Sequence, residues 1–187
     1  MKPFLSMICS CLITVFIYAN STNCHYSTNS NFARLIDTVP PNPLEKFVGE
    51  WKFKGDSFVT NFSGKYDQGV NPKRTCIAKS TNSNRSIVWD LDFDGFLVDI
   101  FWTYDFKTKK LYHLSNTTED GLANGVGDLK DNGDLDIKLI DAVGCNTCYR
   151  LYSYRWKSAD EISFRCTYFK ENKPTGDYYG TTFLRKK

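Results

Sequence analysis

Histidine is almost absent from this chain, whose 187 residues include two, His25 and His113. A haem-binding barrel uses a histidine as axial ligand, commonly late in the chain, and no histidine follows His113. A Ser-His-Asp triad is equally unsupported, because no Gly-x-Ser-x-Gly segment accompanies this imidazole. The sequence therefore predicts no haem or other cofactor, and it predicts that His113 is a hydrogen-bonded wall residue.

A strong excess of charge is also lacking. The formal net charge is +3, and the lysines and arginines are dispersed along the chain. Nucleic-acid-binding domains carry a basic patch or stripe. No nucleic-acid partner is therefore expected.

No apolar run near the N-terminus is long enough to cross a bilayer comfortably. The run from Ile8 to Tyr18 follows Lys2, whereas a transmembrane helix needs about 20 apolar residues. A short positive segment before such a run is typical of a secretory signal. We predict a signal peptide at residues 1–19, a secreted or periplasmic protein, and no stable membrane span after cleavage. An uncleaved membrane anchor is the alternative.

Residues 20–43 are rich in Asn, Ser, Thr and Pro and read as a flexible linker. Residues 44–187 then alternate apolar runs with turn signals, and aromatic residues make up 16% of the whole chain, a pattern that favours an all-β domain. Short links such as Asp94-Gly95 and the turn at 131–134 indicate an antiparallel meander. The predicted strands cover residues 49–54, 57–62, 74–79, 86–93, 96–105, 110–117, 122–130, 134–141, 149–157, 161–169 and 178–185.

A glycine and a tryptophan open the first predicted strand, and an arginine stands near the end of the last. Gly49 and Trp51 lie at the start and Arg185 at the finish. In a closed barrel the first and last strands meet, so the guanidinium can lie over the indole, a contact worth about 0.5–2 kcal/mol. These three residues are predicted to be structural.

Four segments in order along the chain resemble a calycin-type barrel: Gly49 to Trp51, Tyr104 to Tyr112, Gly125 to Gly133, and Thr181 to Lys186. Among calycins the sequence is most similar to an uncharacterised, mostly bacterial lipocalin-like family. The resemblance implies a single antiparallel meander barrel of about eight to ten strands with one interior cavity. It implies no activity.

Four cysteines lie in the predicted barrel, namely Cys76, Cys145, Cys148 and Cys166. Export favours disulfides, either Cys145–Cys148 with Cys76–Cys166 or the crossed pairings. A zinc site or a redox Cys-x-x-Cys is the functional alternative, but redox motifs stand at a helix N-terminus and this one runs into a strand. A structural disulfide is preferred, and no metal is predicted.

The wall of the barrel is where a ligand would bind, since small barrels alternate interior and exterior residues along every strand. The sequence leaves open which face points inward. Our preferred interior contains Trp102, Tyr104, Tyr152, Tyr154 and Arg165. An aromatic cup with one or two cations suits a hydrophobic ligand that bears an acid group.

The predicted function is an exported, non-catalytic protein that binds a small hydrophobic or amphipathic molecule. No nucleophile–base pair is recognisable, so no catalytic residue is predicted and the chain is not expected to be an enzyme. Two alternatives stay open. One is a calycin-like isomerase or hydrolase of a lipid-like substrate, which predicts a buried titratable group at the floor of the cavity. The other is a protein-interaction barrel whose aromatic rings fill the core.

Overall fold

The computed structural model describes residues 40–70, 75–81, 85–92, 97–118, 121–140 and 145–187. Two short 3₁₀ helices, η3 (Glu45–Phe47) and η4 (Lys54–Asp56), flank the first strand. The strands are β1 (Gly49–Phe53), β2 (Ser57–Phe62), β3 (Lys65–Val70), β4 (Thr75–Ser80), β5 (Ser86–Asp92), β6 (Leu97–Asp105), β7 (Lys110–Thr117), β8 (Gly121–Leu129), β9 (Leu135–Ile140), β10 (Cys148–Ser158), β11 (Glu161–Lys170) and β12 (Lys173–Arg185).

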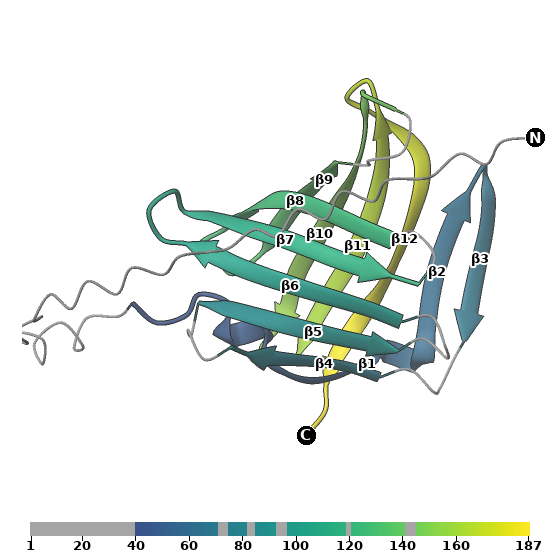
Figure 1. Ribbon diagram of the computed structural model, residues 1–187. Helices are drawn as coiled ribbons and strands as arrows, with labels where there is room; N and C mark the ends of the chain where they lie inside the picture. The colour runs from purple at the N-terminus through teal and green to yellow at the C-terminus, as the bar shows by residue number, and fades with distance from the viewer. Residues whose placement is uncertain (1–39, 71–74, 82–84, 93–96, 119–120, 141–144) are drawn as a thin grey trace, which may run out of the picture. The chain divides into compact units, whose positions relative to one another are not determined.

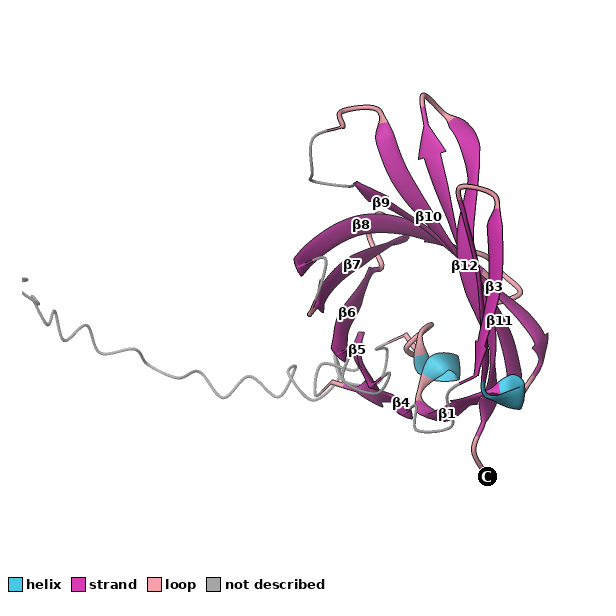
Figure 2. Ribbon diagram, turned by 90° about the vertical axis from the view of Figure 1, so that its right-hand side faces the viewer, coloured by secondary structure: helices cyan, strands magenta, loops and turns pink. Residues whose placement is uncertain are grey.

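Ten of these strands close into an antiparallel barrel. From β4 to β12 each strand pairs with the next along the chain, and β1 joins β4 to β12. Figure 2 shows the strands surrounding a common interior. The all-β class and the mostly sequential meander predicted from the sequence are therefore confirmed.

The β2–β3 hairpin stands outside this simple order. The long strand β12 pairs with β1 through residues 183–185 and with β2 through residues 178–180. Figure 1 shows the resulting hairpin beside β12. One half of β12 therefore belongs to the ring of ten, and the other half carries a two-stranded extension of the wall.

The turn before β1 plugs one end of the barrel. The Phe47 ring is fully buried, with its centroid 5.3 Å from that of Trp102 and 5.2 Å from that of Trp156. Trp89 and Tyr154 complete the cluster, both with centroids within 6.3 Å of Phe47. The expectation that aromatic rings fill the core describes this end of the barrel, which we call the closed end.

The seam between the first and last strands lies at the same end. Arg185 Cζ is 4.3 Å from the centroid of the Trp51 ring, so the contact expected from the sequence is present. The guanidinium also donates to the carbonyls of Val48 at 2.5 Å and Lys46 at 2.7 Å. Gly49 has φ +141°, and a Cβ there would lie 2.6 Å from Arg185 Nη1. A side chain at position 49 would therefore clash with the guanidinium of Arg185.

Two glycines of β8 let that strand approach β9 closely. A Cβ on Gly125 would lie 2.6 Å from both the Leu139 side chain and the Lys138 carbonyl oxygen. A Cβ on Gly127 would lie 2.9 Å from Ile137 and from the Asp136 carbonyl. Because Gly125 and Gly127 bear no side chains, the larger side chains of β9 occupy the inner surface beside β8.

Replacing Gly125 with alanine is expected to lower the free energy of unfolding by about 1–3 kcal/mol, because the new methyl meets a backbone oxygen that cannot move freely. Asn124→Ala, at the exposed neighbouring position, is the control and should change stability by less than about 0.5 kcal/mol. Urea denaturation of the two variants measures both values. Equal effects would contradict the packing role of Gly125.

Several sequence expectations lie outside the described residues. The signal peptide at 1–19, residues 20–39 of the linker and the Asp94-Gly95 turn are among them. Within the described residues, no helix is long and apolar enough to span a bilayer.

Candidate functional site

The inner wall of the barrel becomes less buried with distance from Phe47, which plugs the closed end. Trp51 and Trp102 at the closed end are fully buried, whereas Phe58, Tyr168 and Tyr179 face the same interior and are only half-buried. These three rings come from β2, β11 and β12, and the Tyr179 centroid lies 5.5 Å from that of Phe58 and 6.3 Å from that of Tyr168. The wall formed by these strands is therefore aromatic and partly open to solvent.

His113 lies on the inner face of β7, between the closed end and this aromatic wall. Its side chain is 3% exposed, and its Nδ1 accepts a hydrogen bond of 2.8 Å from Trp102 Nε1. Because the indole N–H can only donate, the Nδ1 atom carries a lone pair and the proton of the neutral imidazole is on Nε2. That Nε2 has no hydrogen-bond partner among the described residues.

Burial is the main cause that lowers the pKa of His113 to about 3, and the positive charge of Arg150 adds to the effect. The imidazole is therefore neutral at ordinary pH. With Nδ1 engaged by Trp102 and Nε2 protonated, it offers a single N–H donor to the interior. It has no lone pair available to act as a general base.

Two further buried nitrogens without partners in the described residues are Asn42 Nδ2 and Trp89 Nε1. Both residues belong to the closed end, where Trp89 packs against Phe47. The nitrogen of His113 differs because it lies beside other polar inner-face groups.

Tyr152 packs against the His113 ring and shares a hydrogen bond with Tyr179. Their oxygens are 2.8 Å apart, and the Tyr152 ring meets the His113 ring edge-on with centroids 5.7 Å apart. Burial raises the pKa of both tyrosines well above the usual range, so the hydroxyls stay protonated. Two hydroxyls that share one hydrogen bond keep one O–H to donate elsewhere.

Arg150 brings a positive charge to the same interior. It alternates with Tyr152 along β10 and is therefore on the inner face, paired with Leu139 of β9 and Tyr168 of β11. The charge is close enough to lower the pKa of His113 and to oppose the rise at Tyr152. We call Arg150, His113, Tyr152 and Tyr179 the interior polar group.

Four of the five predicted cavity residues lie on the inner face, but only one belongs to this group. Trp102 and Tyr154 pack in the closed-end cluster with centroids 5.1 Å apart, and Tyr104 packs on Phe106. Tyr152 is the one beside His113. The predicted set thus contributes mainly to packing at the closed end.

Arg165 is corrected by the structure, since it lies outside the barrel. The inner face of β11 carries Phe164 and Cys166, so Arg165 between them points outward. It is exposed, and its Cζ stacks 3.9 Å from the centroid of Tyr178. The arginine on the inner face is Arg150, which alternates with Tyr152 along β10.

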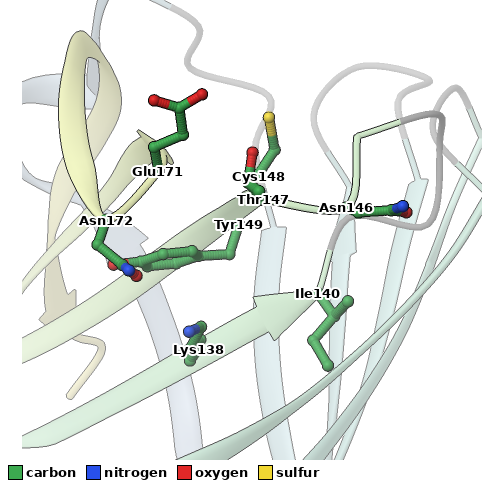
Figure 3. Close-up of a pocket in the computed structure, with 8 residues that line it drawn as sticks. All are labelled: Lys138, Ile140, Asn146, Thr147, Cys148, Tyr149, Glu171 and Asn172. Atoms are coloured by element: carbon green, nitrogen blue, oxygen red, sulfur yellow. The ribbon is translucent and has the colours of Figure 1, made fainter.

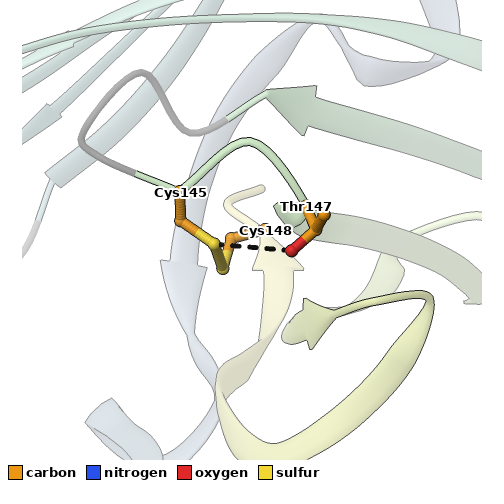
Figure 4. Close-up of a disulfide and its surroundings, with 3 residues drawn as sticks. All are labelled: Cys145, Thr147 and Cys148. Atoms are coloured by element: carbon orange, nitrogen blue, oxygen red, sulfur yellow. Dashed lines mark hydrogen bonds between the residues drawn. A yellow bond between two sulfur atoms is a disulfide. The ribbon is translucent and has the colours of Figure 1, made fainter.

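The cysteines follow the predicted scheme only in part. Cys145 and Cys148 form a disulfide with Cα atoms 5.3 Å apart, and Cys145 Sγ lies 3.7 Å from Thr147 Oγ1 (Figure 4). Cys76 and Cys166 are buried thiols, so the expected second disulfide is absent. They lie on β4 and β11, which β1 and β12 separate in the sheet. Burial raises the pKa of the Cys76 thiol, which makes it unreactive.

Metal binding finds no support in the described part of the chain, where no three His, Cys, Asp or Glu side chains gather in a suitable arrangement.

A pocket of about 520 Å³ lies beside the disulfide, at the tips of the strands (Figure 3). Lys138 Nζ lies 4.0 Å from the centroid of the Tyr149 ring, whose other contact is a parallel stack on Phe169 with centroids 4.8 Å apart. The remaining lining residues are Ile140, Asn146, Thr147, Cys148, Glu171 and Asn172. Lys138 and Phe169 therefore both contact the half-buried Tyr149 ring at this pocket.

No protein-family model and no curated protein matches the chain. Solved structures that it resembles include a de novo designed fluorescence-activating β-barrel, with a TM-score of 0.30 and 13% identity over 78% of this chain and 98% of the other. A DUF3598-family protein of unknown function from Nostoc punctiforme gives a TM-score of 0.25 and 6% identity, over 80% and 100%. The β-barrel fold is compatible with ligand binding, and no family is assigned.

Proposed function

We propose that the protein is an exported, non-catalytic binding protein that holds a small hydrophobic or amphipathic ligand inside its barrel. The observation that carries the proposal is the buried Nε2–H of His113, which has no partner among the described residues. A buried donor without an acceptor costs about 1–3 kcal/mol. A ligand oxygen placed in the interior offsets that cost.

The surroundings of His113 suit such a ligand. The wall next to it is built from the half-buried rings of Phe58, Tyr168 and Tyr179. A mostly apolar wall with a few converging polar groups is the usual composition of a small-molecule site. The resemblance of the sequence to calycin barrels points in the same direction.

The enzyme alternative is less well supported. It predicted a buried titratable group with a shifted pKa, and His113 is such a group. Its protonation pattern, however, makes it a donor and leaves it without a basic nitrogen. The interaction-module alternative predicted a filled core, which describes the closed end, whereas the wall around Tyr179 is partly open.

Native mass spectrometry of the purified protein, before and after denaturation, tests the proposal. We expect a small molecule that is present in the native protein and lost on unfolding. Ser115→Phe, on the buried inner face next to His113, should reduce its occupancy at least severalfold. Asn116→Phe adds the same ring at the exposed neighbouring position and should leave occupancy unchanged.

An empty protein that also takes up no hydrophobic dye would overturn the proposal. Equal ligand occupancy in the Ser115 and Asn116 variants would place the ligand outside the barrel and contradict it as well.

A further inference from the structure

We infer that the outer face of β6, β7 and β8 is a docking surface for a second copy of this chain. The inference goes beyond the proposed ligand function, because it concerns the outside of the barrel wall. The three strands lie side by side (Figure 1). Their outward apolar side chains form what we call the outer apolar patch, which consists of Phe101, Tyr112, Leu114, Leu122 and Val126.

The side chains of the outer apolar patch are neighbours in the register of the sheet. Phe101 of β6 lies directly opposite Leu114 of β7, and Tyr112 of β7 lies directly opposite Val126 of β8. Leu122 lies on the diagonal from Leu114, a separation that long side chains can bridge. The five residues are between 39% and 69% exposed. They therefore form one continuous apolar surface in contact with water.

The patch departs from the polar outer face that a half-buried strand normally carries. Asp136 of β9 and Ser153 of β10 show the usual composition, since the Ser153 hydroxyl donates to the Asp136 carboxylate at 2.8 Å. Arg155 of β10 forms an ion pair with the same carboxylate. Monomeric proteins rarely expose a contiguous apolar area larger than a few hundred Å². The patch is therefore typical of a surface that a partner covers.

The size of the patch suits the centre of a small dimer interface. Roughly half of each of its five side chains is in contact with water, which corresponds to about 400 Å² of apolar surface. A standard interface buries about 800 Å² on each partner, and a polar rim surrounds its apolar centre. The patch supplies the centre, and the charged residues at its two ends supply the rim. We therefore expect a dimer that forms at micromolar concentrations.

Opposite charges at the two ends of the patch favour a second copy as the partner. At one end Asp99 of β6 lies directly opposite Asp90 of β5. Like charges in this arrangement destabilise a sheet. Lys79 pairs with Asp90 at 3.5 Å, whereas Asp99 has no ion pair among the described residues. This end of the patch therefore presents a negative charge that a partner can neutralise.

The turn between β6 and β7 places positive charge at the other end of the patch. Lys107 and Lys109 are exposed in this turn, and neither forms an ion pair within the part of the chain that the structure describes. Lys110 of β7 pairs with Asp128 of β8, and Asp105 accepts a hydrogen bond of 2.9 Å from the backbone N–H of Lys107. The three lysines thus outnumber the two carboxylates, and this end has an excess of positive charge.

A two-fold rotation about an axis that crosses the strands at the centre of the patch brings the two ends together. The Asp99 end of each copy then lies at the lysine end of its partner, and the two apolar patches face each other. The symmetry makes each contact between opposite charges occur twice. A uniformly charged lipid surface or a basic peptide would be attracted to one end and repelled by the other. The charge pattern therefore favours a second copy.

Sedimentation velocity of the purified protein over a range of micromolar concentrations tests the inference. We expect the native chain to form a dimer. Leu114→Asp should raise the dissociation constant of the dimer at least tenfold, because it places a charge at the centre of the patch. Tyr66→Asp is the matched control, since Tyr66 is 62% exposed on β3 and lies outside the patch, and this variant should dimerise like the native protein.

Charge reversal tests the pairing of the two ends. Asp99→Lys and the double variant Lys107→Glu/Lys109→Glu should each weaken the dimer severalfold, because each then meets like charge in its partner. An equimolar mixture of the two should form a heterodimer at least as tightly as the native protein dimerises, because both contacts again join opposite charges. The three positions are exposed, so these substitutions are expected to leave the fold intact.

Thermal unfolding of each variant precedes these measurements, and Leu114→Thr replaces Leu114→Asp if the latter does not fold. A native protein that stays monomeric at every concentration would overturn the inference, as would a dimer that the Leu114 substitution leaves unchanged. A monomer that binds phosphatidylcholine vesicles would assign the patch to a lipid surface and contradict the inference as well. Failure of the two charge variants to associate when mixed would contradict the two-fold pairing of the ends.

Discussion

Acidification is expected to lower the free energy of unfolding by about 1.4 kcal/mol for each pH unit between pH 6.5 and about 3, through His113 alone. In the unfolded chain this imidazole takes up a proton near pH 6.5, whereas in the folded protein burial and Arg150 delay protonation to about pH 3. The unfolded state therefore binds more protons throughout this interval, and it gains stability as the pH falls. Above pH 6.5 the contribution of His113 does not depend on pH.

The groups that face His113 explain why its pKa is lowered and not raised. Trp102 of β6 donates to Nδ1, Tyr152 of β10 packs on the ring, and Arg150 contributes a like charge. Gly125, its register neighbour on β8, bears no side chain. Among these described neighbours none stabilises an imidazolium. Desolvation and repulsion by Arg150 therefore both lower the pKa of His113.

His113→Asn isolates this effect from the carboxylates that also titrate in acid. Asparagine keeps an oxygen near the position of Nδ1 to accept the Trp102 N–H, but it does not titrate. Denaturant titrations of both proteins between pH 7 and 4 should show the native protein losing stability more steeply. A stability difference that stays constant over that range would contradict a buried, neutral His113.

Trp51→Ala is expected to lower the free energy of unfolding by about 3–5 kcal/mol. The indole is fully buried, and its Nε1 donates to the Phe47 carbonyl at 2.9 Å. Its ring carries the guanidinium of Arg185 and lies 6.0 Å from the centroid of Trp156. Removing it opens a cavity at the seam where β1 meets β12, and it also leaves the plug at Phe47 without its hydrogen bond.

Trp51→Phe is the control for the ring itself. Phenylalanine retains much of the packing but lacks the N–H, so we expect a smaller loss of about 1–2 kcal/mol. Guanidinium denaturation of the three proteins gives the comparison. If alanine and phenylalanine cost the same, the packing at the closed end does not depend on the volume of Trp51, contrary to the structure.

Much of the barrel could be predicted because its strands carry a period-two pattern with one buried face. The alternation in β6 and β7, for example, places Trp102 and His113 inside and Phe101 and Leu114 outside. Turn residues between consecutive runs then imply a meander. Closure followed from the residues at the two ends, and Trp51 lies directly opposite Arg185 in the β1–β12 register.

Two elements could not be predicted in the same way. The described side chains of β3, residues 65–69, are all exposed, so the strand has no apolar face to reveal it. The first half of β12 contains Pro174 and Gly176, which weaken a strand pattern. It is nonetheless a strand, because β11 pairs with it, and β2 pairs with the segment that follows.

The candidate site was harder to predict than the fold, because a shift of one residue in the register of a strand moves every side chain to the opposite face. Tyr152 was assigned to the interior, and the same alternation along β10 would have placed Arg150 there. On β11 the sequence prediction placed Arg165 in the interior, whereas its side chain points outward. The free donor of His113 depends on the Trp102 hydrogen bond, which joins two strands, and no sequence pattern reports it.

The most direct test of the account is a ¹⁵N-detected NMR titration of the imidazole of His113 with octanoate. The chain has only two histidines, so assignment is simple. We predict a neutral ring protonated at Nε2 in the absence of ligand, and a saturable shift of the Nε2 signal as octanoate binds. An Nε2 signal that stays unchanged while octanoate binds elsewhere would contradict a ligand site inside the barrel.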